Sequence, residues 1–201
     1  MGKSRGVYKK SRLIFGAGIN DADYVTEYRV DGKWGICPYY LTWRNMLRRC
    51  YSEKFQKHQP TYKGCSVCPE WLYFMTFRKW MSSQDWQGKE LDKDLLVEGN
   101  KVYSGDNCVF VDKITNTFTN SNGRARGNYL LGVCFYKPSG KFVARCCNPF
   151  SKKLEHLGYF TCQHQAHITW KKRKHELACQ LAESQTDLRV ADALRRRYLP
   201  E

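Results

Sequence analysis

The spacing of hydrophobic and polar residues predicts two helices in the first half of the chain. In the stretch 41–52, LTWRNMLRRCYS, apolar residues recur three or four positions apart, which is typical of one buried helix face. These residues are Trp43, Met46, Leu47, Cys50 and Tyr51. Pro69 fits the first position of a second helix, and residues 70–81 are apolar nearly all round, so we expect that helix to be buried.

The middle of the chain predicts a strand, a loop, a second strand and a short helix. The stretch 91–120, LDKDLLVEGNKVYSGDNCVFVDKITNTFTN, has turn residues around Gly99 and Gly105. Strand-forming residues stand between and after these turns, the last of them in the run 109–111. The segment 112–120 that follows is expected to form the helix.

The last third of the chain predicts an antiparallel sheet and two further helices. Three segments have the composition of strands: 129–136, 141–147 and 154–160. KPSG supplies a hairpin turn between the first two. Thr161 is placed to cap a helix over 162–182, and a basic helix over 187–198 ends before Pro200. The longer helix has one apolar stripe: Ala166, Trp170, Leu177 and Leu181. The fold class expected is therefore α+β, with a three-stranded antiparallel sheet on one helix and a C-terminal helix.

Composition sets the class of protein. Hydrophobic residues make up 42% and aromatic residues 14% of the 201 residues, so a folded core is expected. No apolar run approaches the roughly 18 residues of a membrane span. The basic N-terminus has no long apolar segment of a secretory signal. We therefore expect a cytoplasmic protein with no membrane partner.

The ten cysteines are expected to be reduced thiols. Cys146 and Cys147 are adjacent on a predicted strand and point to opposite faces. Cys65 and Cys68 form one C-x-x-C pair, whereas a structural zinc ion needs four ligands. Although other cysteines could complete such a site, no second closely spaced pair is present, so structural Zn²⁺ is not expected.

The net charge of +15 favours a polyanionic partner. Both halves of the chain are basic, since residues 124–201 carry +9 and residues 1–123 carry +6. The basic residues are interleaved with Tyr, Trp and Phe, which favours nucleic acid. A merely soluble basic surface is the alternative, and for the runs 171–174 and 195–197 a solvated helix face is the usual explanation.

The middle stretch resembles the HNH, or beta-beta-alpha-metal, endonuclease motif of phage and intron-encoded homing endonucleases. The resemblance covers about residues 18–122 and rests on several motifs: WRNMLRRCY, PTYKGCSVCPEW, LDKD, GNKVYSGDNCVFV and TNTFTN. It implies hydrolysis of DNA phosphodiester bonds with one divalent metal ion, Mg²⁺ or Mn²⁺. By position, Asp92 and Asn116 would be metal ligands, and Asn107 would hold the catalytic histidine.

The chain departs from this family at the catalytic base. Lys93 stands where the histidine is expected, and there is no histidine between His58 and His156. Histidine accepts a proton near neutral pH, while an ordinary lysine is charged and is a poor base. Asp94 is the other candidate for that role. The alternative is a catalytically inert DNA-binding frame, in which Asp92 and the asparagines are turn and cap residues.

The C-terminal stretch resembles the Apetala-type, or ethylene-response-factor, DNA-binding domain over about residues 128–182. The motifs are Gly132-Val133, GKFVA from Gly140, and LGYF from Leu157, followed by Ala166. In that family the sheet face opposite the helix binds duplex DNA. Alternation places Phe142, Ala144 and Cys146 toward the helix and Lys141, Val143, Arg145 and Cys147 on the other face. The resemblance implies that DNA contacts come from these residues: Tyr136, Lys141, Arg145, Lys153 and His156.

The prediction is thus a phage-type, HNH-like DNA endonuclease anchored on double-stranded DNA. The expected domain boundaries are a basic, loosely ordered arm at 1–20, the HNH-like domain at 21–122, the Apetala-type domain at 128–182 and a basic helix at 183–201. Residues 119–128 are the expected linker. The rival from another class is a non-cleaving regulator or an inhibitor of a host nucleic-acid machine, and a host protein or RNA is a further possible partner. If the chain is a phage protein, it acts inside the infected bacterium. The sequence sets no oligomeric state.

Overall fold

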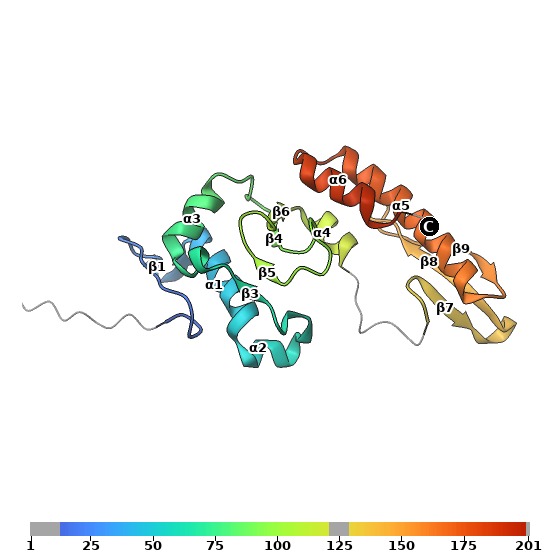
Figure 1. The fold of residues 1–201 in the computed structure, drawn as a ribbon, viewed down its shortest axis with the longest axis horizontal. Helices are drawn as coiled ribbons and strands as arrows, with labels where there is room; N and C mark the ends of the chain where they lie inside the picture. Colours follow the sequence, from blue (N-terminus) through green and yellow to red (C-terminus); the bar gives the residue numbers. More distant parts are fainter. Residues whose placement is uncertain (1–12, 121–128, 200–201) are drawn as a thin grey trace, which may run out of the picture. The chain divides into compact units, whose positions relative to one another are not determined.

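The computed structural model describes residues 13–120 and 129–199, so residues 121–128 of the linker expected at 119–128 lie outside the described residues, while Thr119 and Asn120 end a helix. The chain forms two compact units (Figure 1). Of the described residues, the N-terminal unit holds 13–87 together with Gly99–Phe110. The C-terminal unit holds Gly88–Glu98, 111–120 and 129–199.

The described part of the N-terminal unit contains three helices and two small sheets. Its helices are α1 (Pro38–Tyr51), α2 (Glu53–His58) and α3 (Phe74–Ser82), with single 3-10 turns at Pro60–Tyr62 and Pro69–Leu72. Its strands are β1 (Glu27–Val30), β2 (Lys33–Ile36), β3 (Ser66–Val67) and β5 (Val102–Tyr103). The pair β1–β2 is an antiparallel hairpin, and the pair β3–β5 is parallel.

Helix α1 confirms the amphipathic pattern predicted for residues 41–52. Its apolar stripe is fully buried at Trp43, Met46 and Leu47 and packs with Phe74 and Phe77 of α3. The indole Nε1 of Trp43 donates a hydrogen bond of 2.7 Å to the Trp71 carbonyl. Because this polar group has a partner, the tryptophan can lie in the centre of the apolar core.

The predicted helix over 70–81 is wrong at its start. Pro69 begins a 3-10 turn, Tyr73 is extended, and α3 begins only at Phe74. The backbone of Ile19 makes the difference, because its N–H donates to the Leu72 carbonyl at 2.8 Å and its carbonyl accepts from Phe74 N–H at 3.0 Å. This pairing holds the chain extended at Tyr73 and divides the helix in two.

Residues 13–20 are packed against α1, so the expectation of a loosely ordered arm is wrong for this part. Gly18 lies so close to Trp43 and Leu47 that a Cβ atom there would be 2.2 Å from Leu47 Cδ1. Only a glycine allows the backbone to approach the helix this closely. Residues 1–12 of the expected arm lie outside the described residues.

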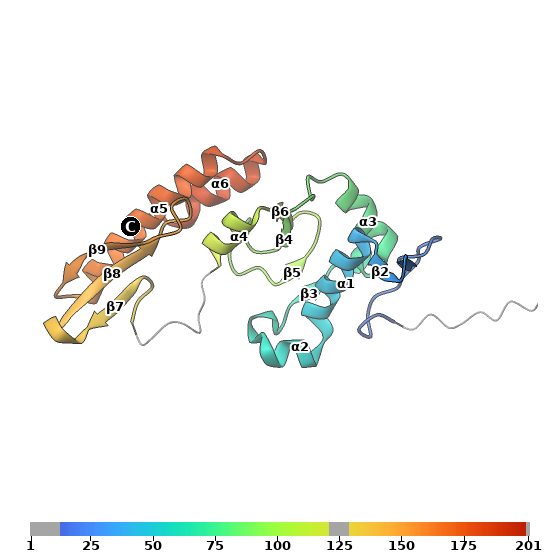
Figure 2. The same cartoon turned by 180° about the vertical axis from the view of Figure 1, so that it is seen from behind.

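The described residues of the C-terminal unit form a three-stranded sheet and the helices α4, α5 and α6 (Figures 1 and 2). Its elements are β4 (Glu90–Asp92), α4 (Lys113–Thr119), β7 (Val133–Tyr136), β8 (Lys141–Cys147), β9 (Leu154–Phe160), α5 (Gln163–Glu183) and α6 (Leu188–Arg197). Strand β4 pairs with β6 (Val109–Val111), the strand at which the chain re-enters this unit. The three strands form an antiparallel sheet in the order β7-β8-β9. The sheet packs on α5, and α6 packs on α5 as well. These contacts confirm the predicted α+β fold.

Aspartate side chains cap the starts of α4 and α6. Asp112 Oδ1 accepts a 2.7 Å hydrogen bond from Thr115 N–H at the start of α4, and Asp187 caps α6 in the same way. Thr161, the expected cap of α5, does not hold this position. The first helical residue is Gln163, and Cys162 precedes it without a side-chain cap.

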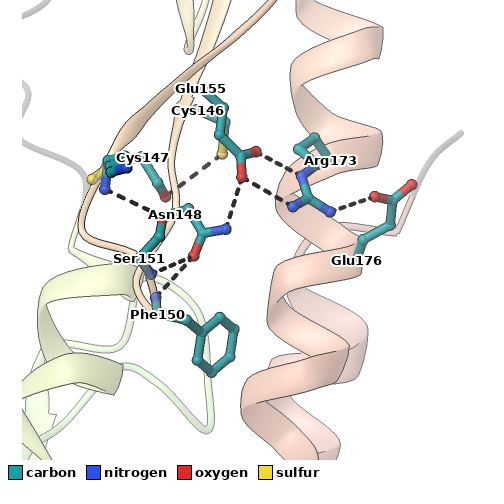
Figure 3. Close-up of polar contacts among 9 residues, drawn as sticks. Cys146, Cys147, Asn148, Phe150, Ser151, Glu155, Arg173 and Glu176 are labelled. Carbon is teal, nitrogen blue, oxygen red and sulfur yellow. Dashed lines mark hydrogen bonds and ion pairs between the residues drawn. The ribbon is translucent and has the colours of Figure 1, made fainter.

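A polar network joins the sheet to α5 (Figure 3). Arg173 of α5 donates two hydrogen bonds to Glu155 of β9, at 2.7 and 3.1 Å, and a third to Glu176. Asn148 Nδ2 donates to the same Glu155 carboxylate at 2.7 Å. The hydrogen bonds from Arg173 and Asn148 lower the pKa of Glu155 to about 2. The carboxylate is therefore ionised at neutral pH and fixes this face of the sheet against the helix.

The basic run at 171–174 is not a uniformly solvated face, as the usual explanation would have it. The ammonium of Lys174 lies 3.3 Å from the centre of the Phe118 ring and donates a 2.8 Å hydrogen bond to the Phe118 carbonyl. Burial lowers the pKa of Lys174 to about 8. In the other basic run, 195–197, Arg197 donates a hydrogen bond of 3.4 Å to the Asp94 carbonyl. These cations attach α5 and α6 to the segments around α4 and β4.

Gly132 lies where the start of β7 packs closely against Trp170 of α5. It has a φ of +74°, and a Cβ atom there would lie 2.0 Å from Cγ of Trp170. Gly140 has a similar φ of +62° but faces open space. We predict that Gly140→Ala lowers the free energy of unfolding by about 1 kcal/mol. Gly132→Ala should cost a further ~1–3 kcal/mol because the alanine collides with the indole ring.

Urea unfolding of the two glycine variants, monitored by circular dichroism, measures this difference. Equal losses would show that only the backbone conformation matters and that Trp170 moves aside at no cost.

Candidate functional site

One carboxylate and one amide lie together at β4 and α4, the region where the resemblance to the HNH motif predicted a metal. Asn116 of α4 donates a hydrogen bond from Nδ2 to the carboxylate of Glu90 on β4. Its Oδ1 accepts a 3.0 Å hydrogen bond from Asn120. Glu90 was missed by the sequence analysis. The signal available was its spacing, since residues two apart in a strand share a face and Glu90 precedes Asp92 by two.

Asp92 has a structural role in the turn that follows β4. Its Oδ1 accepts hydrogen bonds from the backbone N–H groups of Asp94, at 2.9 Å, and Leu95, at 2.7 Å. Its side chain is 8% exposed. Burial raises the pKa of the Asp92 carboxyl, and the charge of Asp94 adds to this rise, while the two backbone donors oppose it. One oxygen of this carboxylate is thus already engaged in holding the chain.

Lys93 is held as the partner of a carboxylate. It is buried, and its Nζ donates a 3.0 Å hydrogen bond to Asp94 Oδ2. In this contact Lys93 is the donor and Asp94 the acceptor, so the lysine is not placed as a base. Asp94 is partly exposed and is the one of the two whose charged form can act as a base.

Asn107 belongs to the N-terminal unit, in the turn before β6, whereas the other expected catalytic residues belong to the C-terminal unit: Asp92, Lys93, Asp94 and Asn116. Over the described part of the chain, His, Cys, Asp and Glu side chains do not gather in groups of three or more that could hold a metal ion. The donors beside one another are Glu90 and Asn116, with oxygen atoms of the kind that Mg²⁺ or Mn²⁺ prefers. Waters and phosphate oxygens would have to supply most of the other ligands, as is usual for Mg²⁺.

The second candidate site is the face of the β7-β8-β9 sheet that points away from α5. Cys146 of β8 pairs with Glu155, whose carboxylate bonds to α5, so this side of β8 faces the helix. Side chains alternate along a strand, and directly paired residues share a face. Tyr136 pairs with Lys141, Arg145 with His156, and Val143 with Tyr159. We call the outward-facing set the open sheet face: Cys134, Tyr136, Lys141, Val143, Arg145, Cys147, Leu154, His156 and Tyr159.

A β-bulge in β9 decides which of its side chains reach the open sheet face. The register shifts between Ala144 and Arg145, because Ala144 pairs with Gly158 and Arg145 with His156, which leaves Leu157 unpaired. Gly158 has a φ of +134°, a backbone conformation that favours glycine. Strict alternation would place His156 and Tyr159 on opposite faces, whereas the bulge places both outward. Tyr159 was missed by the sequence analysis for this reason, and Gly158 was the signal for the irregularity.

Four of the five expected DNA-contacting residues share the open sheet face. Tyr136, Lys141, Arg145 and His156 are all exposed there, and none of the residues that define the face is acidic. Lys153, the fifth, is exposed in the turn between β8 and β9, where its carbonyl accepts from Asn148 N–H. Val143 was expected outward with Lys141 and Arg145, and it is on that face but fully buried.

The ten cysteines are all free thiols. Cys147 is the one that is exposed, and it lies on the open sheet face, whereas Cys146 is buried against α5. Burial raises the pKa of the Cys146 thiol, which keeps it protonated and unreactive.

Comparisons with known proteins give no family for this chain: no family model matches it, and neither a curated protein nor a solved structure matches it. Within residues 13–120 and 129–199, every helix is too short or too polar to cross a lipid bilayer.

The hydrogen bonds of Asp92 predict how the candidate metal site tolerates substitution. Asp92→Ala removes an acceptor of two backbone N–H groups, and we expect it to lower the free energy of unfolding by about 1–2 kcal/mol. Asp92→Asn keeps an acceptor oxygen and should lose less than half of that amount. Urea unfolding at neutral pH measures both. Equal losses would show that the negative charge, not the acceptor, stabilises the turn.

Proposed function

We propose that the protein binds DNA through the open sheet face of β7-β8-β9. The observation that carries the proposal is the convergence of Lys141, Arg145, Tyr136 and His156 on one exposed face with no acidic member. Cations bind the phosphate backbone, and arginine can also read base edges. The rigid attachment of the opposite face to α5 supports this role, because binding residues act best on elements that packing holds in place.

The net charge of the chain further supports nucleic-acid binding, but not every cation is available for it. The net charge of +15 favours a polyanion, but several cations of α5 and α6 are engaged in packing or ion pairs. The nucleic-acid contact is therefore a local one, made by few cations. The resemblance to Apetala-type domains implies duplex DNA as the ligand.

Metal-dependent cleavage of DNA at β4 and α4 is the second candidate function. The contact between Asn116 and Glu90 favours it, since it brings two oxygen-bearing side chains together at the position of the HNH-like motif. Glu90, Asn116 and the partly engaged Asp92 would hold the ion, and a bound Mg²⁺ or Mn²⁺ would stabilise charge on the scissile phosphate. The buried, paired Lys93 holds Asp94 in place beside them. The rival is a protein that binds without cleaving.

The proposed DNA contact predicts a matched difference between two double variants. Lys141→Ala with Arg145→Ala should weaken DNA binding at least tenfold and lower the slope of log K against log salt by about 2. The control, Lys172→Ala with Arg195→Ala, removes the same charge from exposed positions elsewhere and should change affinity less than threefold. Fluorescence anisotropy at several salt concentrations measures both. Equal losses would mean that net charge alone determines binding.

The candidate metal site predicts nicking of supercoiled plasmid in the presence of Mg²⁺ or Mn²⁺. Nicking should disappear with a chelator and fall at least 100-fold in Asn116→Ala and Glu90→Gln, because these side chains would hold the ion. Asp92→Asn is preferable to Asp92→Ala here, because it keeps the turn. Protein that binds DNA but leaves the plasmid intact with either metal, on random and phage DNA alike, would support the inert frame.

A further inference from the structure

Three aromatic rings form a continuous row across the open sheet face. The ring centres of Tyr136 and Tyr159 are 5.8 Å apart, and those of His156 and Tyr159 are 4.7 Å apart. Tyr136 is 40% exposed and Tyr159 51% exposed, and His156 is exposed as well. We call these three side chains the aromatic row. It is solvent-facing rather than part of the core, which is unusual for rings in contact with one another.

The row extends over the middle strand. Tyr136 lies on β7 and Tyr159 on β9, with β8 between them. Two strands separated by a third are about 9.6 Å apart, so rings whose centres are 5.8 Å apart must lean toward each other over β8. This explains why Val143, in the middle strand, is fully buried although it points outward. The rings therefore have a fixed apolar support beneath them and present their outer surfaces to solvent.

A fully paired duplex is a poor match for such a surface. The major groove presents base edges with hydrogen-bonding atoms, and its one strong apolar feature is the thymine methyl group. The face offers only two side chains with several N–H donors for such edges, Lys141 and Arg145. The hydroxyl of each tyrosine can reach a groove edge, but the exposed faces of the rings in its centre would be set against polar edges without a flat apolar partner.

An unpaired base is a good match for the same surface. Its flat face stacks on aromatic side chains, and each such contact contributes about 1–3 kcal/mol. Sequence-tolerant binding of single strands combines stacking rings with cations that hold the phosphates. Here Lys141 and Arg145 lie on β8, in the same face as the row. We propose that the open sheet face binds unpaired nucleic-acid bases, with Tyr159 as the central stacking residue and Lys141 and Arg145 as phosphate contacts.

This inference rests on the proposed nucleic-acid function of the face and specifies its ligand. It replaces the duplex implied by the Apetala-type resemblance with single-stranded or locally unpaired nucleic acid. Tyr159 becomes the specificity-determining residue, because it contacts both of the other rings and is placed outward by the bulge.

The test compares one labelled pyrimidine-rich DNA strand, the same strand paired with its complement, and the same sequence as RNA. The full-length chain should bind at least one of the two single-stranded probes, DNA or RNA, more tightly than it binds the duplex. Tyr159→Leu keeps an apolar side chain over Val143 but has no ring, and it should weaken single-strand binding about fivefold to 100-fold. Tyr159→Phe keeps the ring and should restore binding. Phe150→Ala removes an equally exposed ring, 51%, from the turn outside the row and should have no effect.

Each outcome of the comparison decides between the two claims. Tighter duplex binding with an unchanged affinity in Tyr159→Leu would overturn the inference but leave the proposed function, which then depends on Lys141 and Arg145 alone. Salt-insensitive or absent binding of all three probes by the folded wild-type chain would overturn the proposed function and the inference with it. Thermal melting of each variant excludes loss of folding, and Tyr136→Leu provides a second variant of the row if Tyr159→Leu is unstable.

Discussion

The register shift between β8 and β9 is the constraint on which the proposed binding surface depends. In a regular strand, Glu155 and Tyr159 would share one face and His156 would lie on the other. The bulge at Leu157 divides the strand into two parts with opposite alternation. Glu155 therefore turns inward to the helix, while His156 and Tyr159 both turn outward. One unpaired residue thus serves the packing and the open face at once.

The side chains that face α5 hold the sheet in place, and this makes the open sheet face rigid. The Glu155 carboxylate accepts hydrogen bonds from both Arg173 and Asn148, so β9, the β8–β9 turn and α5 are joined at one group. Packing of Gly132 against Trp170 fixes the start of β7 on the same helix. Because the three strands are held from below, the side chains above them keep their relative positions without a ligand.

The basic residues of the chain illustrate how a large net charge is distributed among different roles. Lys174 and Arg197 bond to backbone carbonyls around α4 and β4 and stabilise the C-terminal unit. Arg173 serves the sheet. Net charge alone therefore overstates the number of cations available to the proposed nucleic-acid-binding surface. The carboxylates show the same competition, since Asp92 is engaged by two backbone N–H groups that a metal ion would have to share.

Local patterns in the sequence determined the elements, and long-range contacts determined how these elements are used. Periodicity determines the helix over 41–52 and the strand at 141–147. Side-chain hydrogen bonds within a few residues determine the helix starts at Asp112 and Asp187. The break at Tyr73 comes from Ile19, more than fifty residues away, which no local pattern reveals.

The candidate sites divide in the same way. The sequence alone identified Lys141 and Arg145 as residues of one face, because alternation within a strand fixes them locally, while Tyr136 was predicted only from the resemblance to Apetala-type domains. The tertiary structure alone added Tyr159 and paired Glu90 with Asn116. A bulge depends on how a strand fits its neighbour and its helix, and a pairing between distant elements depends on the packed chain, so neither is encoded in the spacing of the residues themselves.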